Sequence, residues 1–498
     1  MPDTYQGIKM KRVIFLIYAV FFCSLLSWGQ QTWNLSETMK ATLDDKGVLT
    51  ISTTKDSEDM PDFHATSVSS NTPWYNYRFQ VTSVVIENGV SSIGSSPFYD
   101  FANLIAITIP NSVTSIRSNA FYMVGPNLVS ITIPKSVSLI EFGAFWQCLG
   151  LKSINVDTGN PAYSSEDGVL YDKDKTLLLT YPRMKSGSFM IPNSVKRIEL
   201  YAFGDCQELS NIEIPNSVTS IGRDAFANCF KLTSVSIPAS VTNIETFAFD
   251  IASPNFTAIN VDIANPAYSS DGGVFYNKDK STLIKYPKGK KGSTFTIPNT
   301  VNRIEHFAFN VSDLITVEIP NSVTYIGVGA FWCNAKLESL DIPASVIKIE
   351  GGAFLNCLAL KDVTVHWLEP VLFHIPENPA DDCVHHIFEG VNVANVTLHV
   401  PYGTESIYRN TPGWKEFNIV SSTVSIDNIA SQSLKAFSSN GNLNISGLQP
   451  SKPLSIYNLD GQLVYQGIAK TEEVQIPLTT RGIYIVSTVN QSIKIIVK

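Results

Sequence analysis

The chain has 498 residues, of which 44% are hydrophobic and 16% charged, and its formal net charge is −8. This length allows several ordinary domains or one long repeat array with additional modules. A weakly acidic chain with few charges lacks the basic surface that nucleic-acid binding requires, so we exclude DNA and RNA as partners.

The first residues have the pattern of an export signal. The basic pair Lys11 and Arg12 precedes an apolar stretch, residues 13–28, and the small residues Ser27 and Gly29 precede an expected cleavage site. We therefore predict a signal peptide over residues 1–29 and a secreted or outer-surface protein. The apolar stretch is shorter than the about 20 residues of a membrane-spanning helix. We accordingly expect no integral membrane span in the mature chain, with a retained anchor as the less favoured alternative.

Residues 30–80 lack the pattern that follows and are expected to form an N-terminal cap. Over residues 81–420 the chain repeats Ile-Pro, then Ser-Val or Thr-Val, then Ile, then Ala-Phe. Pro192, Pro215 and Pro238, for example, are 23 residues apart. A fixed period of this size indicates a stacked solenoid, because one unit cannot bury its own apolar face and must pack on its neighbours.

One repeat shows how a turn is built. Val235 and Ile237 are two residues apart and so share the inner face of an extended strand, whereas Ser234 and Ser236 point outward. Pro238 has no amide proton and ends the strand. We expect these strands to form a parallel ladder on one face of the solenoid, and the Ala-Phe segments to form short helical or 3-10 pieces on the other.

Two of the longer units carry nearly the same insert, residues 155–182 and 260–287, which match at 18 of 28 positions. In each insert a Gly-Val-Leu-Tyr or Gly-Val-Phe-Tyr segment leads through a polar turn into another apolar run, which predicts a β-hairpin. The first insert also holds carboxylates that suggest calcium as an alternative: Asp157, Asp167, Asp172 and Asp174. We favour turn formation, because the second copy replaces two of them by Gly272 and Asn277.

Four cysteines keep the phase of the repeat, three residues after the Phe of an Ala-Phe pair: Cys148, Cys206, Cys229 and Cys357. Free cysteine is among the most buried residue types, so we expect a ladder of interior thiols. Because an exported protein can also form disulfides, a bond between Cys206 and Cys229 in adjacent turns is the alternative.

A second group of possible ligands lies near the end of the array, where Cys383, His385 and His386 follow Asp381 and Asp382. Zinc uses such side chains. The two adjacent histidines would point to opposite faces of a strand, and no spaced Cys or His pair accompanies them. We therefore predict a loop that closes the array, with no metal and no cofactor.

A serine-rich linker precedes a separate module over residues 424–498. Its segments "LSIYNLDGQLVYQG" and "GIYIVSTVNQSIKIIVK" alternate apolar and polar residues between Asp-Gly and Gly turns. This pattern predicts a small antiparallel β-sandwich.

The motifs "IPNSVTSIG", "AFANC" and "KLTSVSIP" resemble the BspA-type leucine-rich repeats of surface proteins from the Bacteroides lineage, over residues 81–420. The resemblance implies a β-rich, right-handed leucine-rich-repeat solenoid on the outer surface of a Gram-negative bacterium, and adhesion to host matrix proteins or to other bacteria. The last module is similar to the C-terminal sorting domain of type IX secretion cargo through "IYNLDGQLVYQG", "RGIYIV" and "KIIVK". It lacks the Pro-Asn-Pro-rich opening of that domain near Phe437.

The sequence contains no Gly-x-Ser-x-Gly elbow, phosphate-binding loop, dinucleotide fingerprint or His-Glu-x-x-His motif, so we do not expect an enzyme. A glycosidase or peptidase built on the inserts is disfavoured, because no carboxylate pair is kept in both copies.

We predict a monomeric, non-enzymatic adhesin that binds an extracellular protein or cell-surface ligand. The candidate residues are outward strand positions on a concave face: Thr132, Asn211, Glu213, Ser236, Glu318 and Asp341. The alternative is a glycan-binding accessory protein of nutrient uptake, which would use aromatic residues near the Ala-Phe segments: Trp146, Tyr201, Tyr325 and Trp332.

Overall fold

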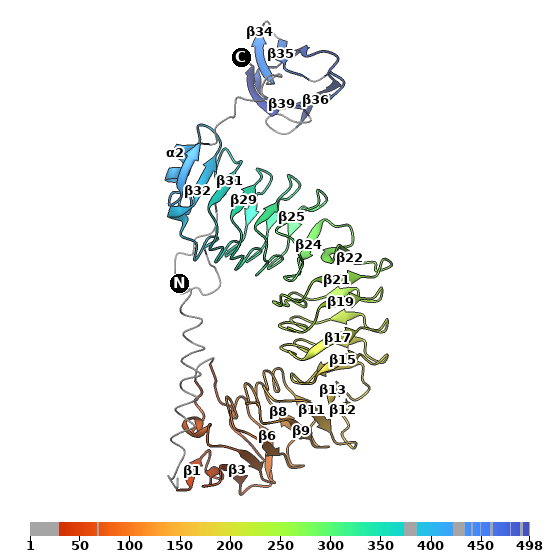
Figure 1. Ribbon diagram of the computed structural model, residues 1–498, viewed down its shortest axis with the longest axis vertical. Helices are drawn as coiled ribbons and strands as arrows, with labels where there is room; N and C mark the ends of the chain where they lie inside the picture. Colours follow the sequence, from red (N-terminus) through yellow and green to blue (C-terminus); the bar gives the residue numbers. More distant parts are fainter. Residues whose placement is uncertain are drawn as a thin grey trace. The chain divides into compact units, whose positions relative to one another are not determined.

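Figure 1 shows the computed structural model, which describes residues 29–66, 69–372, 386–421, 434–439, 442–448, 450–458, 462–478, 480–488 and 492–497. The chain divides into two compact units, Met1–Ser421 and Ser422–Lys498. Residues 1–28, which hold nearly all of the predicted signal peptide, lie outside the described residues, as do Cys383 and His385.

The first unit is a solenoid whose turns stack along two parallel ladders of strands (Figure 1). Within each sheet, neighbouring parallel strands pair one repeat apart, so that Val317 lies opposite Leu340 on the next turn. This arrangement confirms the predicted β-rich repeat solenoid with parallel strands on one face. The long-strand ladder consists of β5 (Ser83–Ile86), β7 (Ala106–Thr108), β9 (Ser130–Ile133), β11 (Ser153–Val156), β15 (Gly187–Met190), β17 (Leu209–Glu213), β19 (Ser234–Ile237), β21 (Ala258–Val261), β25 (Thr294–Thr296), β27 (Thr316–Glu318), β29 (Ser339–Ile342), β31 (Asp362–Val365), β32 (Thr397–Val400) and β33 (Asn418–Ser421).

The opposite side of each turn contributes to a second ladder, which the sequence analysis missed. Most of its strands are only two residues long, too short for an alternating pattern to reveal them. Ile304, Ile326 and Ile349 lie opposite one another on three successive turns of this ladder. The short-strand ladder consists of β4 (Glu58–Asp59), β6 (Val90–Ile93), β8 (Ser115–Ile116), β10 (Leu139–Ile140), β14 (Leu177–Thr180), β16 (Arg197–Ile198), β18 (Ser220–Ile221), β20 (Asn243–Ile244), β24 (Thr282–Lys285), β26 (Arg303–Ile304), β28 (Tyr325–Ile326) and β30 (Lys348–Ile349).

The Ala-Phe segments form turns, and the prediction of helical or 3-10 pieces there was wrong. Around Ala225 and Phe226, the flanking residues Asp224 and Asn228 have φ angles of 52° and 57°. A residue in this left-handed region interrupts a right-handed helix. Within the described residues the helical elements lie elsewhere: η1 (Tyr75–Tyr77), η2 (Val393–Asn395) and α2 (Glu405–Asn410).

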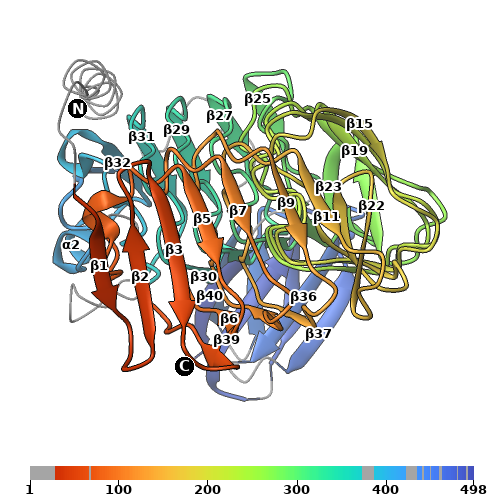
Figure 2. The same ribbon diagram turned by 90° about the horizontal axis from the view of Figure 1, so that it is seen from below.

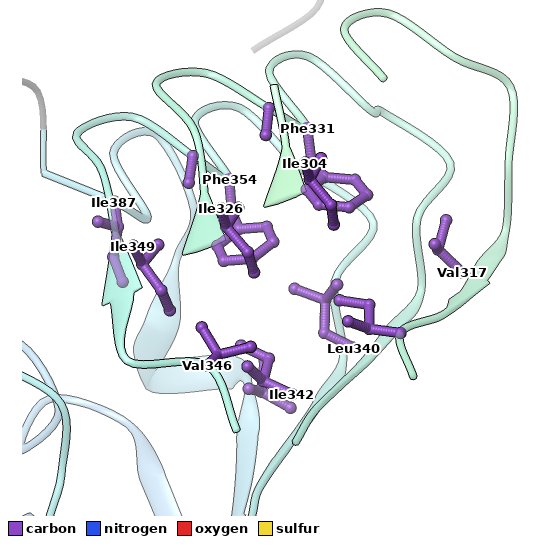
Figure 3. Close-up of a cluster of buried hydrophobic side chains, with 14 of the residues drawn as sticks. Ile304, Val317, Ile326, Phe331, Leu340, Ile342, Val346, Ile349, Phe354 and Ile387 are labelled. Carbon is purple, nitrogen blue, oxygen red and sulfur yellow. The ribbon is translucent and has the colours of Figure 1, made fainter. Parts of the chain in front are cut away.

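The hydrophobic interior is shared between successive turns. Figure 3 shows Ile304, Ile326 and Ile349 of the short-strand ladder beside Phe331 and Phe354, all of them buried. The ring of Phe331 stacks on that of Phe354, with ring centroids 5.4 Å apart. Each ring therefore covers a ring of the next turn, which is why a single turn has no core of its own.

The repeat cysteines are interior residues, as predicted. Cys148, Cys206, Cys229 and Cys357 are buried, and all four thiols are free. The Cys229 thiol donates to the carbonyl oxygen of Phe203 at 3.0 Å, and the Cys206 thiol donates to that of Tyr181 at 3.4 Å. Each thiol thus bonds the backbone of the preceding turn, and the alternative disulfide is not formed.

Each insert is a hairpin that starts a new segment of the short-strand ladder, which confirms the predicted hairpins. In the first insert β12 (Tyr163–Glu166) and β13 (Val169–Asp172) are antiparallel, β13 then pairs with β14, and β14 runs parallel to β16. The second insert repeats this order with β22 (Tyr268–Asp271), β23 (Val274–Asn277) and β24.

At the N-terminal end, β1 (Gln31–Asn34), β2 (Met39–Leu43) and β3 (Val48–Thr53) form an antiparallel meander, and β3 pairs in parallel with β5. Figure 2 shows these strands side by side with β7. Glu58 fastens the meander to β4, because its carboxylate accepts hydrogen bonds from the hydroxyls of Thr53, Ser36 and Thr38. These bonds lower the pKa of Glu58 to about 2.

The second unit contains two antiparallel sheets, in agreement with the predicted small β-sandwich. Leu443, Ile445, Leu454, Ile456 and Val486 are buried in its core. The sheets have the orders β34-β35-β38 and β37-β36-β39-β40, with bounds β34 (Lys435–Ser439), β35 (Asn442–Ser446), β36 (Pro453–Asn458), β37 (Leu463–Ile468), β38 (Glu473–Pro477), β39 (Gly482–Thr488) and β40 (Ser492–Val497).

Candidate binding surfaces

The outward side chains of the long-strand ladder form the first candidate surface, here called the long-strand face. The strands alternate buried and exposed residues, so that Ile131 and Ile133 of β9 enter the core while Ser130 and Thr132 face outward. All six residues predicted for binding are exposed on this face: Thr132, Asn211, Glu213, Ser236, Glu318 and Asp341. Whether this face is the concave one stays a prediction.

The ladder brings some of these residues together. Glu318 of β27 lies opposite Asp341 of β29, with Thr296 and Thr364 at the same level on the strands beyond them. Adjacent strands are about 4.8 Å apart, so the two carboxylates are direct neighbours. Thr132 instead lies opposite Asn155, in a separate part of the ladder. The six residues thus belong to one face but not to one cluster.

Two histidines that the sequence analysis did not single out, His366 and His399, join the acidic part of this face. The imidazole of His366 is 2.6 Å from a carboxylate oxygen of Asp341. The imidazole of His399 on β32 is 3.2 Å from a carboxylate oxygen of Asp362 on β31. Both pairs link side chains of successive turns. His399 lies opposite Thr364 at an outward position of its strand, so the alternation along that strand was the signal that could have identified it.

Two cavities form the second candidate surface, one beside each insert. The first notch has a volume of about 270 Å³, and its lining includes Glu141, Phe142, Trp146, Arg183, Glu199 and Tyr201. The second notch has a volume of about 250 Å³, and its lining includes Glu245, Phe247, Asp250, Lys285, Glu305 and Phe307. The two notches occupy equivalent positions of the duplicated insert and the turns on either side of it.

The first notch unites two of the aromatic residues predicted for glycan binding. The ring centroids of Trp146 and Tyr201 are 5.2 Å apart, and Phe142 lies 5.8 Å from Tyr201. The other two candidates, Tyr325 and Trp332, are not among the residues that line this notch. The guanidinium of Arg303 lies 3.7 Å above the Tyr325 ring, and Trp332 packs edge-on against Phe307.

Two of the four aspartates considered for calcium stabilise turns. The Asp157 carboxylate accepts from the Gly159 amide at 2.8 Å, and that of Asp172 accepts from the Thr176 hydroxyl at 2.6 Å. Among the described residues, no group of three His, Cys, Asp or Glu side chains is placed to hold a metal ion. The possible zinc ligands Cys383 and His385 lie outside the described residues.

The fold and these surfaces define a leucine-rich-repeat solenoid, and proteins of this class are typically binding scaffolds rather than enzymes. The chain belongs to the family described as "BspA type Leucine rich repeat region", which matches residues 70–168, 181–293 and 288–367 in six copies. No catalytic family is indicated. In the part of the chain that the structure describes, no helix is both long and apolar enough to cross a membrane.

Several solved structures are similar to this chain. A leucine rich cell surface protein from Faecalibacterium prausnitzii shares 25% identity, with 80% of this chain and 96% of that chain covered and a TM-score of 0.44. A leucine-rich repeat protein from Eubacterium ventriosum also shares 25% identity, with coverages of 75% and 78% and a TM-score of 0.36. One from Bacteroides ovatus shares 18% identity, with coverages of 80% and 100% and a TM-score of 0.29. No curated protein gives a significant match.

Proposed function

We propose that the protein is a non-enzymatic adhesin, secreted or held at the outer cell surface, that binds an extracellular protein or a cell-surface ligand through the long-strand face. The observation that carries the proposal is the alternation of buried and outward side chains in most strands of this ladder, which turns small or polar side chains outward on many turns. Such a regular polar face is open to a partner over many turns.

The size of the face supports a macromolecular partner. The fourteen strands of the ladder, at about 4.8 Å each, extend over about 60 Å. With strands about 13 Å long, the face offers roughly 800 Å², which equals one partner's share of a standard protein interface. The sheet from β25 to β33 offers only roughly 300 Å² by the same reckoning. A stable complex therefore requires contacts over several segments of the ladder.

The experiment is a quantitative pull-down from host matrix proteins and from neighbouring bacterial surfaces with the mature chain, residues 30–498. Reversing the charge of Glu213, Glu318 and Asp341 to Lys should weaken binding at least tenfold, because opposing charges at an interface are costly. The matched control reverses Asp45, Asp56 and Glu369, which are exposed and lie outside the long-strand face. Equal binding by the two triple variants would refute the assignment of this face.

Export and sorting form a separate part of the proposal. We expect cleavage near Gln30 and, by the resemblance of the last module, type IX sorting to the surface of a Gram-negative bacterium of the Bacteroides lineage. The test compares the location of the full chain and of a chain that ends at Ser421, together with N-terminal sequencing of the secreted form. Equal surface display of the shortened chain would refute a sorting role for residues 424–498.

A glycan-binding accessory protein is the second candidate function, and the first notch favours it. The aromatic rings of Phe142, Trp146 and Tyr201 gather at one cavity that also contains charged side chains. A glycan array with the mature chain separates this function from protein adhesion.

A further inference from the structure

The two notches descend from one repeated segment, but they differ in how their polar groups are paired. In the second notch Asp250 accepts hydrogen bonds from the ammonium of Lys285 and from the side-chain amide of Asn310, each at 2.8 Å. Although burial acts to raise the pKa of Asp250, the ammonium of Lys285 holds it below its usual value, so this carboxylate is ionised. The second notch thus supplies its own anion.

The first notch has no carboxylate at the position that Asp250 occupies in the second. Trp146 occupies the position of Asp250, and Thr180 occupies that of Lys285. The indole Nε1–H of Trp146 is buried and has no hydrogen-bond partner in the part of the chain that the structure describes. Leaving such a donor unpaired costs about 1–3 kcal/mol. A group from outside the chain would remove this cost.

A second donor lines the same cavity. Arg183 is half-buried, and within the described residues its guanidinium makes neither an ion pair nor a hydrogen bond. The nearby carboxylates are already engaged, because Glu141 accepts from Ser118 at 2.8 Å and Glu199 accepts from Arg197 at 2.7 Å. Two residues of the lining, Trp146 and Arg183, therefore carry unused donors, and one of these donors is a cation. Their natural complement is a carboxylate, which a guanidinium binds through two parallel hydrogen bonds.

The other lining residues indicate which kind of molecule carries this carboxylate. The rings of Phe142, Trp146 and Tyr201 form an aromatic wall, and Phe142 is 48% exposed. An aspartate or glutamate side chain of a peptide would pair with Arg183 but would not pack against these aromatic rings. A pyranose ring covers it with its C–H face. The cavity of about 270 Å³ lies below the range of drug-sized ligand pockets and suits a single sugar ring.

We propose that the first notch binds a carboxylate-bearing pyranose, a uronic or sialic acid residue of an acidic glycan. The carboxylate accepts hydrogen bonds from Arg183 and from the indole N–H of Trp146, while the sugar ring packs against Phe142 and Tyr201. This inference deepens the second candidate function, glycan binding, and does not depend on the long-strand face.

The test is isothermal titration of the mature chain with glucuronic acid, galacturonic acid and N-acetylneuraminic acid, with galactose and N-acetylglucosamine as neutral counterparts and an acidic peptide as a further arm. We expect acidic sugars to bind at least tenfold more tightly than neutral sugars and than the peptide. Arg183→Gln should weaken the acidic sugars at least tenfold, and Trp146→Phe, which keeps the ring and removes the N–H, should weaken them about fivefold.

Lys288→Gln is the matched control, because Lys288 occupies the position of Arg183 in the second copy and is buried to a similar degree. It should leave acidic-sugar binding unchanged, and thermal unfolding should show that all three variants keep the fold. Equal affinity for acidic and neutral sugars, or for the peptide, would overturn the carboxylate-sugar assignment while leaving glycan binding in place. If no sugar bound, both the second candidate function and this inference would be overturned. The adhesin proposal would stand, because the pull-down with the long-strand face variants tests it separately.

Discussion

Asn160 offers the sharpest test of how the inserts are held to the solenoid. Its side chain is fully buried in the turn before β12. The amide nitrogen donates to the carbonyl oxygens of Pro134 and Val137 at 2.9 Å each, and the amide oxygen accepts from the backbone amides of Ala162 and Tyr163 at 2.8 Å each. One side chain thus satisfies four backbone groups of two successive turns.

Asn160→Asp keeps the shape of this side chain but removes both donors. Two buried carbonyl oxygens then lose a partner, at about 1–3 kcal/mol each, so the free energy of unfolding should fall by about 2–6 kcal/mol at pH 7.5. A protonated carboxyl regains one donor, and burial favours the protonated form. The deficit should therefore be smaller at pH 4.5 than at pH 7.5.

The assay is urea unfolding of the mature chain, followed by circular dichroism and tryptophan fluorescence. Asn155→Asp is the control, because Asn155 is exposed and its side-chain oxygen only accepts from the Ser153 hydroxyl at 2.8 Å, a role that a carboxylate keeps. It should change stability by less than about 0.5 kcal/mol. Asn265→Asp in the second insert should match the loss at Asn160, because Asn265 makes the same four bonds. Equal effects at Asn155 and Asn160 would refute the reasoning.

Three further predictions concern the core, the N-terminal meander and the thiols. Phe331→Ala should lower the free energy of unfolding in urea by about 3–5 kcal/mol, because the ring is fully buried between two others. Phe230→Ala, at a ring that is 38% exposed, should lower it clearly less. Similar losses in the two variants would contradict a core shared between turns. Because the pKa of Glu58 is lowered to about 2 in the folded protein, its carboxylate stabilises the fold above pH 4.5. This stabilisation is lost as the pH falls towards 2. The difference in melting temperature between the wild type and Glu58→Gln should shrink over that window, and a constant difference would speak against the hydroxyl contacts. Burial raises the pKa of the Cys206 and Cys229 thiols, so iodoacetamide should label them only after unfolding. Peptide mass spectrometry measures this labelling, and rapid labelling of the folded protein would exclude interior thiols.

Much of the first unit could be predicted because its information is local and repeated. The spacing of Val235, Ile237 and Pro238 specifies which side chains face inward and where a strand ends. The other repeats have the same spacing. The interior cysteines and the exposure of Glu318 followed from this periodicity, and the insert hairpins followed from a polar turn between two apolar runs. Side-chain direction in an extended strand depends on residue parity alone, so no tertiary information was needed.

The missed features depend on neighbours in space. The Ala-Phe turns need left-handed residues on both sides, and large residues such as Tyr201 and Phe247 carry no local mark of that conformation. The short-strand ladder has strands of two residues, which become strands only when the next turn supplies their hydrogen bonds.

The notches illustrate the same division. The duplication of the insert is visible in the chain, and so is the exchange of Asp250 for Trp146 at equivalent positions. Whether the polar groups there find partners is decided by which turns pack beside them. Stacking pairs Asp250 with Lys285 in one copy, whereas in the other copy Trp146 and Arg183 have no acceptor among the residues that the structure describes. Hydrogen bonds between turns require the relative placement of segments that are tens of residues apart.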